Sequence, residues 1–148
     1  MTQEEKQLLL KDLCGRMPYR TEINLTDGTS GIITSIRTVP HGTFVTVYFN
    51  RDNAEDVSLE DIRPYLRPMS SITEEENKTI DNISNKGKGF EEDEDGWIRC
   101  DSIHTKWGVC PNGCAKLMDY LNSIHIDYRG LIPMGLAIEA PEDMYKTE

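Results

Sequence analysis

The sequence lacks long apolar segments and is short of positive charge, and each shortage disfavours a class of protein. Its 148 residues contain no apolar run near the roughly 20 residues that a helix needs to cross a bilayer, so we expect no membrane span. Lysine and arginine total 16 against 26 aspartates and glutamates, which gives a formal net charge of −10. Binding to nucleic acid depends on basic side chains that neutralise phosphates, so this balance disfavours a nucleic-acid partner.

Signals for secretion and catalysis are also missing. Residues 1–6 show no basic region followed by an apolar stretch, and we therefore expect a cytoplasmic protein whose thiols stay reduced. The segment NKGKG at 85–89 resembles a phosphate-binding loop only in its glycines, because the GK[ST] ending and a preceding strand are absent. No nucleophile stands at a recognisable spacing from a base, and no acid–base pair stands out. The sequence thus favours a protein that is not an enzyme.

Charge and composition divide the chain into three parts. Residues 69–96 carry 3 basic and 9 acidic side chains, whereas residues 1–68 carry 8 and 10, and residues 97–148 carry 5 and 7. The middle part therefore contains more than half of the net negative charge. We expect residues 1–68 to form a folded core, 69–96 an acidic and partly helical linker, and 97–148 a C-terminal helical segment that packs on the core.

The acidic middle part combines helix signals with loop signals. Ser71 or Thr73 can cap a short helix that runs through about Ile83, and residues 85–96 have the composition of a linker. The EEDED run at 91–95 is typical of a solvated loop. The alternative is an acidic decoy that imitates DNA and occupies a basic host protein.

A capping box and an apolar stripe predict an N-terminal helix. Thr2 stands three residues before Glu5, so the threonine hydroxyl and the glutamate carboxylate can each bind the other's backbone amide. Apolar residues then recur at helical spacing, at Leu8, Leu9, Leu13 and Met17. We expect a helix over about 3–14 that ends near Gly15 and docks its narrow apolar face on another element.

Strand signals follow between residues 18 and 68. The segments TEINLT, GIITSIR and TFVTVYF are rich in β-branched and aromatic residues, and Asp27-Gly28 and Pro40-His41-Gly42 separate them as turns. Residues 57–59 are a fourth strand candidate, and EDIRPYL is predicted to be one tight turn fixed by Pro64. These short, meandering strands predict an α+β protein with a small SH3-like β-barrel. A two-layer sheet packed on the N-terminal helix is the competing interpretation.

Apolar periodicity returns in the C-terminal part. Leu117, Leu121 and Ile124 form a stripe, which predicts a helix over about 113–125 with Asn112 as its N-cap. Asp127 can cap a further turn in YRGLIPM, and LAIEA is expected to be extended.

Three of the four cysteines and one histidine lie within RCDSIHTKWGVCPNGC at 99–114. Cys100, His104, Cys110 and Cys114 supply the number of ligands that a closed structural zinc site needs. The Cys–His and Cys–Cys gaps each hold three residues, which matches none of the common zinc-binding arrays. Cys114 also falls in phase with the helical stripe at Leu117, and free cysteine packs as a small hydrophobe. We therefore expect buried or semi-exposed thiols and no cofactor, with a zinc-stapled domain as the alternative.

Three stretches resemble a family of short uncharacterised proteins encoded in the genomes, phages and mobile elements of gut bacteria of the Bacteroides group. They are EEKQLLLKDLCGRMPY at 4–19, SLEDIRPYLRPMSSITEEE at 58–76 and LMDYLNSIHIDYRGLIPMGLAIEAPEDMY at 117–145. The resemblance implies a small intracellular protein of mobile-element origin and implies no activity. The cysteine-bearing stretch 97–114 departs from the family pattern.

Together these patterns predict a non-catalytic protein-interaction module that binds a protein or peptide partner. The contact is expected at the rim of the barrel or at the DYRGLI segment, through side chains that anchor interfaces disproportionately, namely Arg63, Tyr65, Arg67, Tyr128 and Arg129. A structural role is the alternative for these residues, as two of them illustrate. Tyr65 then closes the barrel, and Arg129 pairs with Glu60 or Asp127.

Overall fold

The computed structural model describes residues 1–50, 53–84, 90–92, 98–100, 103–105 and 111–145. They divide into two compact units, the first made of Met1–Met69 with Asn122–Glu148 and the second of Ser70–Leu121. Helices and strands occur in both units, which confirms the α+β class. No helix within the described ranges is long and apolar enough to span a membrane.

The first unit begins with helix α1 (Gln3–Arg16), which has the predicted capping box. The Glu5 amide donates to Thr2 Oγ1 at 3.1 Å, and the Thr2 amide donates to Glu5 Oε2 at 2.7 Å. Gly15 does not end the helix as predicted. The chain instead passes from Arg16 into the 3₁₀ turn η1 (Met17–Tyr19) and leaves it through Arg20, whose φ is +56°.

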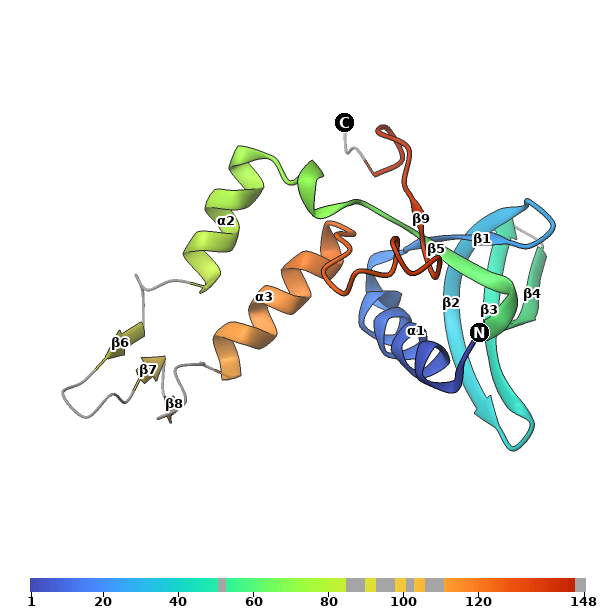
Figure 1. Cartoon of the computed structure of the whole chain (residues 1–148), viewed down its shortest axis with the longest axis horizontal. Helices are drawn as coiled ribbons and strands as arrows, with labels where there is room; N and C mark the ends of the chain where they lie inside the picture. Colours follow the sequence, from blue (N-terminus) through green and yellow to red (C-terminus); the bar gives the residue numbers. More distant parts are fainter. Residues whose placement is uncertain (51–52, 85–89, 93–97, 101–102, 106–110, 146–148) are drawn as a thin grey trace. The chain divides into compact units, whose positions relative to one another are not determined.

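Helix α1 covers one face of a six-stranded mixed sheet (Figure 1). The strands lie in the order β4 (Asn53–Ser58), β3 (Gly42–Asn50), β2 (Ser30–Val39), β1 (Glu22–Leu25), β5 (Ile62–Leu66) and β9 (Ile138–Glu139). Neighbouring strands are antiparallel, apart from the parallel pair β5 and β9. The core between helix and sheet contains Leu9, Leu13, Ile23, Ile33, Val45, Val47, Ile62 and Leu66.

The predicted SH3-like barrel is wrong, because the sheet is open. Closing a sheet requires hydrogen bonds between its first and last strands, and β4 and β9 stand at opposite ends of the strand order. Leucines of α1 fill the inner face of the sheet, and β9 occupies the free side of β5. The competing interpretation, a sheet packed on the N-terminal helix, describes this unit.

The prediction of a single tight turn at EDIRPYL is also wrong. Only Leu59–Asp61 form a 3₁₀ turn, η2, and the next five residues form β5, which pairs with β1. Ile62, Pro64 and Leu66 are buried while Arg63 and Tyr65 between them are not, which is the period-2 pattern of a strand with one face on the core.

Residues after Ser123 return to the first unit and complete its core. Leu131 is fully buried there, together with Leu136 and Ala137, and β9 adds the parallel edge strand. As predicted, Asp127 caps the intervening turn, because its two carboxylate oxygens accept from the amides of Leu131 at 2.8 Å and Ile132 at 2.9 Å.

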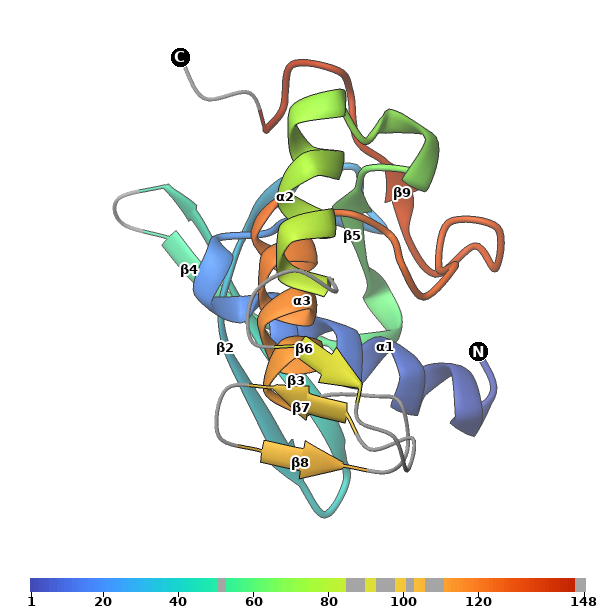
Figure 2. The ribbon, with the colours of Figure 1, turned by 90° about the vertical axis from the view of Figure 1, so that its left-hand side faces the viewer.

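The second unit contains two helices and a small sheet. Helix α2 (Glu74–Ser84) is capped by Thr73, one of the two predicted caps, since the Glu76 amide donates to its hydroxyl at 3.2 Å. Strands β6 (Phe90–Glu92), β7 (Ile98–Cys100) and β8 (Ile103–Thr105) form an antiparallel sheet (Figure 2). Apart from β6, the predicted linker at 85–96 lies outside the described residues.

Helix α3 (Pro111–Ser123) begins two residues before the predicted start, so Asn112 lies inside it and is not its N-cap. Proline suits the first turn of a helix because its φ is fixed near the helical value and its missing amide hydrogen is not needed there. The helix ends before His125, whose φ is +62°.

Candidate functional site

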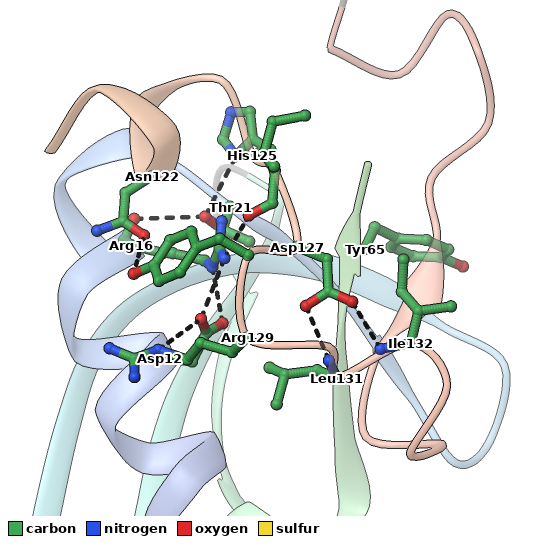
Figure 3. Close-up of polar contacts among 12 residues, drawn as sticks. Asp12, Arg16, Thr21, Tyr65, Asn122, His125, Asp127, Arg129, Leu131 and Ile132 are labelled. Atoms are coloured by element: carbon green, nitrogen blue, oxygen red, sulfur yellow. Dashed lines mark hydrogen bonds and ion pairs between the residues drawn. The ribbon is translucent and has the colours of Figure 1, made fainter. Parts of the chain in front are cut away.

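Two guanidinium groups meet one buried carboxylate inside the first unit (Figure 3). Arg16 Nε donates to Asp12 Oδ2 at 2.7 Å, and Arg16 Nη2 donates to Asp12 Oδ1 at 3.0 Å. Arg129 Nε lies 3.4 Å from the same Oδ1 atom. Asp12 and Arg16 are completely buried, one helical turn apart on α1. Arg16 Nη2 also donates to the carbonyl oxygen of Ile126 at 2.7 Å, so the ion pair fastens α1 to the C-terminal segment.

An aromatic ring lies beside both guanidinium groups. The Cζ atoms of Arg16 and Arg129 are each 5.2 Å from the centroid of Tyr128, whose hydroxyl donates to Asn122 Oδ1 at 2.9 Å. Arg16 Nη1 and Arg129 Nε are buried and have no hydrogen-bond partner within the described part of the chain. One carboxylate neutralises only one of the two guanidinium charges, and the negative face of the Tyr128 ring stabilises part of the remaining positive charge.

A second group of contacts holds the C-terminal segment to the sheet through Tyr145. Its ring stacks on His125, with centroids 3.7 Å apart and an interplanar angle of 15°. Its hydroxyl donates to the carbonyl oxygen of Tyr65 at 2.8 Å and accepts from the amide of Glu22 at 3.1 Å. The ladder between β1 and β5 ends at the pair Ile23 and Pro64. The Tyr145 hydroxyl joins the next pair of residues, Glu22 of β1 and Tyr65 of β5. Burial raises the pKa of Tyr145 well above its usual value.

Burial, with a further contribution from the charges of Arg16 and Arg67, lowers the pKa of His125 to about 4. The imidazole of His125 is therefore neutral in the folded protein at neutral pH, and its ordinary pKa, that of the unfolded chain, is 6.5. A lowered histidine pKa means that the unfolded chain binds the proton more readily than the folded one. The stability due to neutral His125 is thus complete above pH 6.5 and is lost as the pH falls from 6.5 to about 4.

The contacts of this cluster tie chain segments together. Both oxygens of Asp127 accept from backbone amides, so this carboxylate does not orient the imidazole of His125. The side-chain neighbour of His125 Nδ1 is the hydroxyl of Thr21, 3.4 Å away and itself fully buried. The polar cluster therefore holds α1 to the residues that follow Ser123 through hydrogen bonds and ion pairs.

A groove of about 390 Å³ opens elsewhere on the first unit, between α1 and the turn that joins β2 to β3. Gln3, Lys6, Gln7 and Leu10 form its helical wall, with the i, i+3, i+4, i+7 spacing of one helix face. The facing wall comes from the β2–β3 turn, the start of β3, the end of β4 and η2, and consists of Pro40, His41, Gly42, Thr43, Phe44, Ser58, Leu59 and Glu60. Lys6 and Glu60 form an ion pair across the groove.

The sequence contained a signal for this groove that the prediction missed. Successive residues of a helix turn by about 100°, so the three consecutive leucines at 8–10 cannot share one face. Leu9 is completely buried in the core, whereas Leu10 is half-buried and lines the groove.

The five predicted contact residues all make contacts within the first unit. Arg63 is exposed and its Nε donates to the carbonyl oxygen of Gly135 at 2.8 Å, while the half-buried Tyr65 accepts from Asn24 Nδ2 at 3.0 Å. Arg67 Nη1 donates to the carbonyl oxygen of Ile124 at 3.2 Å.

Tyr128 and Arg129 belong to the buried cluster described above, beside Asp12. Asp12 is the ion-pair partner of Arg129, so the two carboxylates suggested from the sequence, Glu60 and Asp127, were wrong. The role of the five residues in binding a partner stays a prediction.

The predicted zinc ligands belong to the second unit. Cys100 lies in β7, His104 in β8 and Cys114 in α3, and the strand register places Arg99 opposite His104. Cys110 and the side chains of the other three lie outside the described residues, so zinc binding and thiol burial both stay predictions. Within the described part, no three histidine, cysteine or acidic side chains are grouped to hold a metal.

Comparison with known proteins gives no family assignment. No protein-family model matches the chain, and neither the curated proteins nor the solved structures contain a match. The resemblance in three sequence stretches thus stays a prediction. Among the described residues, the groove beside α1 offers a ligand both apolar and hydrogen-bonding contacts.

Proposed function

We propose that this protein is a non-catalytic interaction module that holds an extended peptide segment of a partner protein in the groove between α1 and the β2–β3 turn. The observation that carries the proposal is the groove itself. Its volume of about 390 Å³ is within the range of ligand-binding pockets, and regular elements form both walls. The groove lies at the turn end of the β2–β3 hairpin, and none of the five contact residues predicted from the sequence lines it.

The chemistry of the lining suits a peptide. Leu10, Phe44 and Leu59 supply apolar surface for one or two side chains. The side-chain amides of Gln3 and Gln7 can each donate and accept hydrogen bonds, as a peptide backbone requires. A ligand therefore finds apolar contact in the middle of the groove and polar partners along its helical side.

Two observations favour binding over catalysis at this place. The carboxylate of the groove, Glu60, is ion-paired with Lys6, and its pKa is lowered by the hydrogen bond and the charge of that lysine. Such a group stays ionised at neutral pH and is a poor proton donor. The remaining polar side chains of the lining, apart from His41, are amides and hydroxyls.

The contact residues predicted from sequence keep a secondary place in the proposal. Arg63 is exposed and Tyr65 half-buried on β5, and both can contact a partner beyond the groove. Arg67, Tyr128 and Arg129 have internal contacts that assign them to holding the C-terminal segment.

The proposal also keeps the cytoplasmic location and the phage or mobile-element origin. The resemblance of residues 4–19, 58–76 and 117–145 to proteins of mobile elements supports the origin. Cys14 is an exposed free thiol, which fits a reducing compartment. Sequencing the genomic neighbourhood of related genes tests the origin, and a consistent location among housekeeping genes would contradict it.

A peptide-display selection on the full chain tests the function. Selected peptides should shift the NMR signals of backbone amides at 41–44 and 58–60 on binding. Leu10→Asn removes apolar contact worth about 1 kcal/mol and should weaken binding about fivefold.

Leu8→Asn is the matched control, because Leu8 is also half-buried on α1 and packs on the core but does not line the groove. It should cost similar stability and leave peptide affinity unchanged. Equal loss of binding in both variants, or signal shifts confined to other surfaces, would rule out the groove.

A further inference from the structure

The groove contains one carboxylate, and further carboxylates stand next to its lining residues in the chain. Glu60 lines it and Asp61 follows in the same turn, and Glu4 stands beside Gln3 on the exposed first turn of α1. Lys6 is the only lysine or arginine among the lining residues. The positive N-terminal end of α1 is already satisfied, because Thr2 and Glu5 cap it reciprocally. The lining thus pairs one carboxylate with one lysine, the N-terminal ammonium also acts on Glu60, and the excess negative charge is that of the chain as a whole.

The ion pair of Lys6 with Glu60 is open to exchange. The two side chains are 32% and 53% exposed, and pairs in such surroundings contribute little because water and salt screen them. A cation from a partner can take the place of Lys6 beside Glu60 without a large loss. The displaced lysine then returns to water, which its flexible stem permits.

The apolar part of the groove lies next to this carboxylate. Leu59 and Glu60 are consecutive residues of η2, and both line the groove together with Leu10 of α1. Lysine and arginine side chains combine an aliphatic stem with a charged end, and they bury the stem on apolar surface while the charge stays at the edge. Leu10 and Leu59 can contact the aliphatic stem, and the carboxylate of Glu60 can pair with the charged end.

We infer that the groove selects a basic peptide, with the aliphatic stem of a lysine or arginine lying on Leu10 and Leu59 and its cationic end on the carboxylate of Glu60. This inference rests on the proposed function, since it names the class of partner for the same groove. It requires no rearrangement of the sheet and only the exchange of one surface ion pair.

The test uses synthetic versions of a display-selected peptide, in which the lysine or arginine is kept or replaced by methionine or glutamate. Binding to the full chain is measured by calorimetry at two salt concentrations, and the binding site is located by NMR shifts of the amides at 41–44 and 58–60. Replacement of the basic residue by methionine should weaken binding about fivefold, and replacement by glutamate should weaken it further. Affinity for the basic peptide should fall as salt is added.

Three variants locate the effect. Glu60→Gln should remove most of the preference for the basic peptide, whereas Lys6→Met should strengthen binding severalfold because Glu60 is no longer shared. Glu55→Gln is the control, since Glu55 is an exposed carboxylate on β4 that does not line the groove. It should leave the preference unchanged.

The outcomes separate the inference from the function on which it rests. Peptides that bind in the groove without a preference for basic residues, or a preference that survives Glu60→Gln, would overturn the inference and leave the proposed function standing. Selection that yields no peptide able to shift the groove signals would overturn the proposed function, and the basic partner with it.

Discussion

Replacing Arg16 by methionine should destabilise the first unit far more than the same replacement at Arg37. The two arginines form ion pairs of similar length, with N–O distances of 2.7 Å to Asp12 and 3.0 Å to Asp56. Their surroundings differ. Both side chains of the first pair are completely buried, whereas those of the second are 62% and 44% exposed.

The expected cost follows from what is left behind. Without Arg16, the buried carboxylate of Asp12 keeps only Arg129, 3.4 Å away, and the carbonyl oxygen of Ile126 loses its donor. Removing one partner of a buried pair typically costs about 3–5 kcal/mol, and Arg129 places this case near the lower end. For about 100 residues this corresponds to a fall in melting temperature of at least about 12 °C. Arg37→Met should cost less than about 1 kcal/mol, because water already screens that pair.

The measurement has to report on the first unit alone, because the chain contains two compact units. Amide hydrogen exchange resolved by residue meets this need. The slowest-exchanging amides of β1, β2 and β5 give the free energy of opening of the sheet, and the difference between each variant and the original chain gives the cost.

A compensating variant makes the reasoning stricter. Adding Asp12→Leu to Arg16→Met removes the stranded carboxylate, and replacing a buried ion pair by apolar groups is often neutral. The double variant should therefore regain at least half of the lost stability. Equal costs for Arg16→Met and Arg37→Met, or a double variant less stable than Arg16→Met, would refute the view that the buried charge determines the effect.

The remaining predictions concern the C-terminal fastening and one close approach in the sheet. Tyr145→Phe removes the hydroxyl that bridges β1 and β5 and should cost about 1–3 kcal/mol in urea unfolding, more than Tyr65→Phe, whose hydroxyl makes a half-buried contact. Stability of the original chain should fall by up to about 3 kcal/mol more than that of His125→Asn between pH 6.5 and about 4, because only the original has the imidazole with the lowered pKa. His41→Asn is the control and should show the same pH dependence of stability as the original chain. If the stability of the original chain depends on pH in the same way as that of His125→Asn, the assignment to His125 is wrong. Gly31→Ala should cost about 1–3 kcal/mol, because the new Cβ would lie 2.7 Å from a valine carbon and 2.8 Å from a backbone oxygen; an unchanged melting temperature would show that the strands part easily.

Features set by neighbouring residues could be predicted from the sequence. The capping box at Thr2, the cap at Asp127 and the turn at Asp27-Gly28 each depend on a few consecutive residues, and all three occur in the structure. The hydroxyl and amide of Thr29 both donate to Asp27 Oδ1, which completes this turn. Such patterns have the same energetics in most proteins, so their presence in a sequence is informative.

Features that depend on distant residues could not be predicted in the same way. Whether the sheet closes depends on what lies beside β5, and that strand, β9, comes some seventy residues later. The turn at EDIRPYL was predicted because of Pro64. The alternation of Ile62, Pro64 and Leu66 with polar residues is, however, the pattern of a strand. Proline lacks only one backbone donor, and burial of the alternating side chains outweighs this loss.

The buried ion pair shows most directly why contacts within the chain could not be told from contacts with a partner by sequence alone. Asp12 and Arg16 stand four residues apart, the spacing of an ordinary surface pair on a helix, and nothing local indicates that both are buried. Burial arises because Tyr128 and Arg129, more than one hundred residues later, cover them. Tyrosine and arginine are frequent between proteins because their planar polar ends satisfy buried hydrogen-bonding groups at low entropic cost. A contact between two distant segments of one chain also buries hydrogen-bonding groups that need partners. Residue type alone therefore identifies side chains suited to an interface, but does not say whether that interface lies within the protein or between proteins.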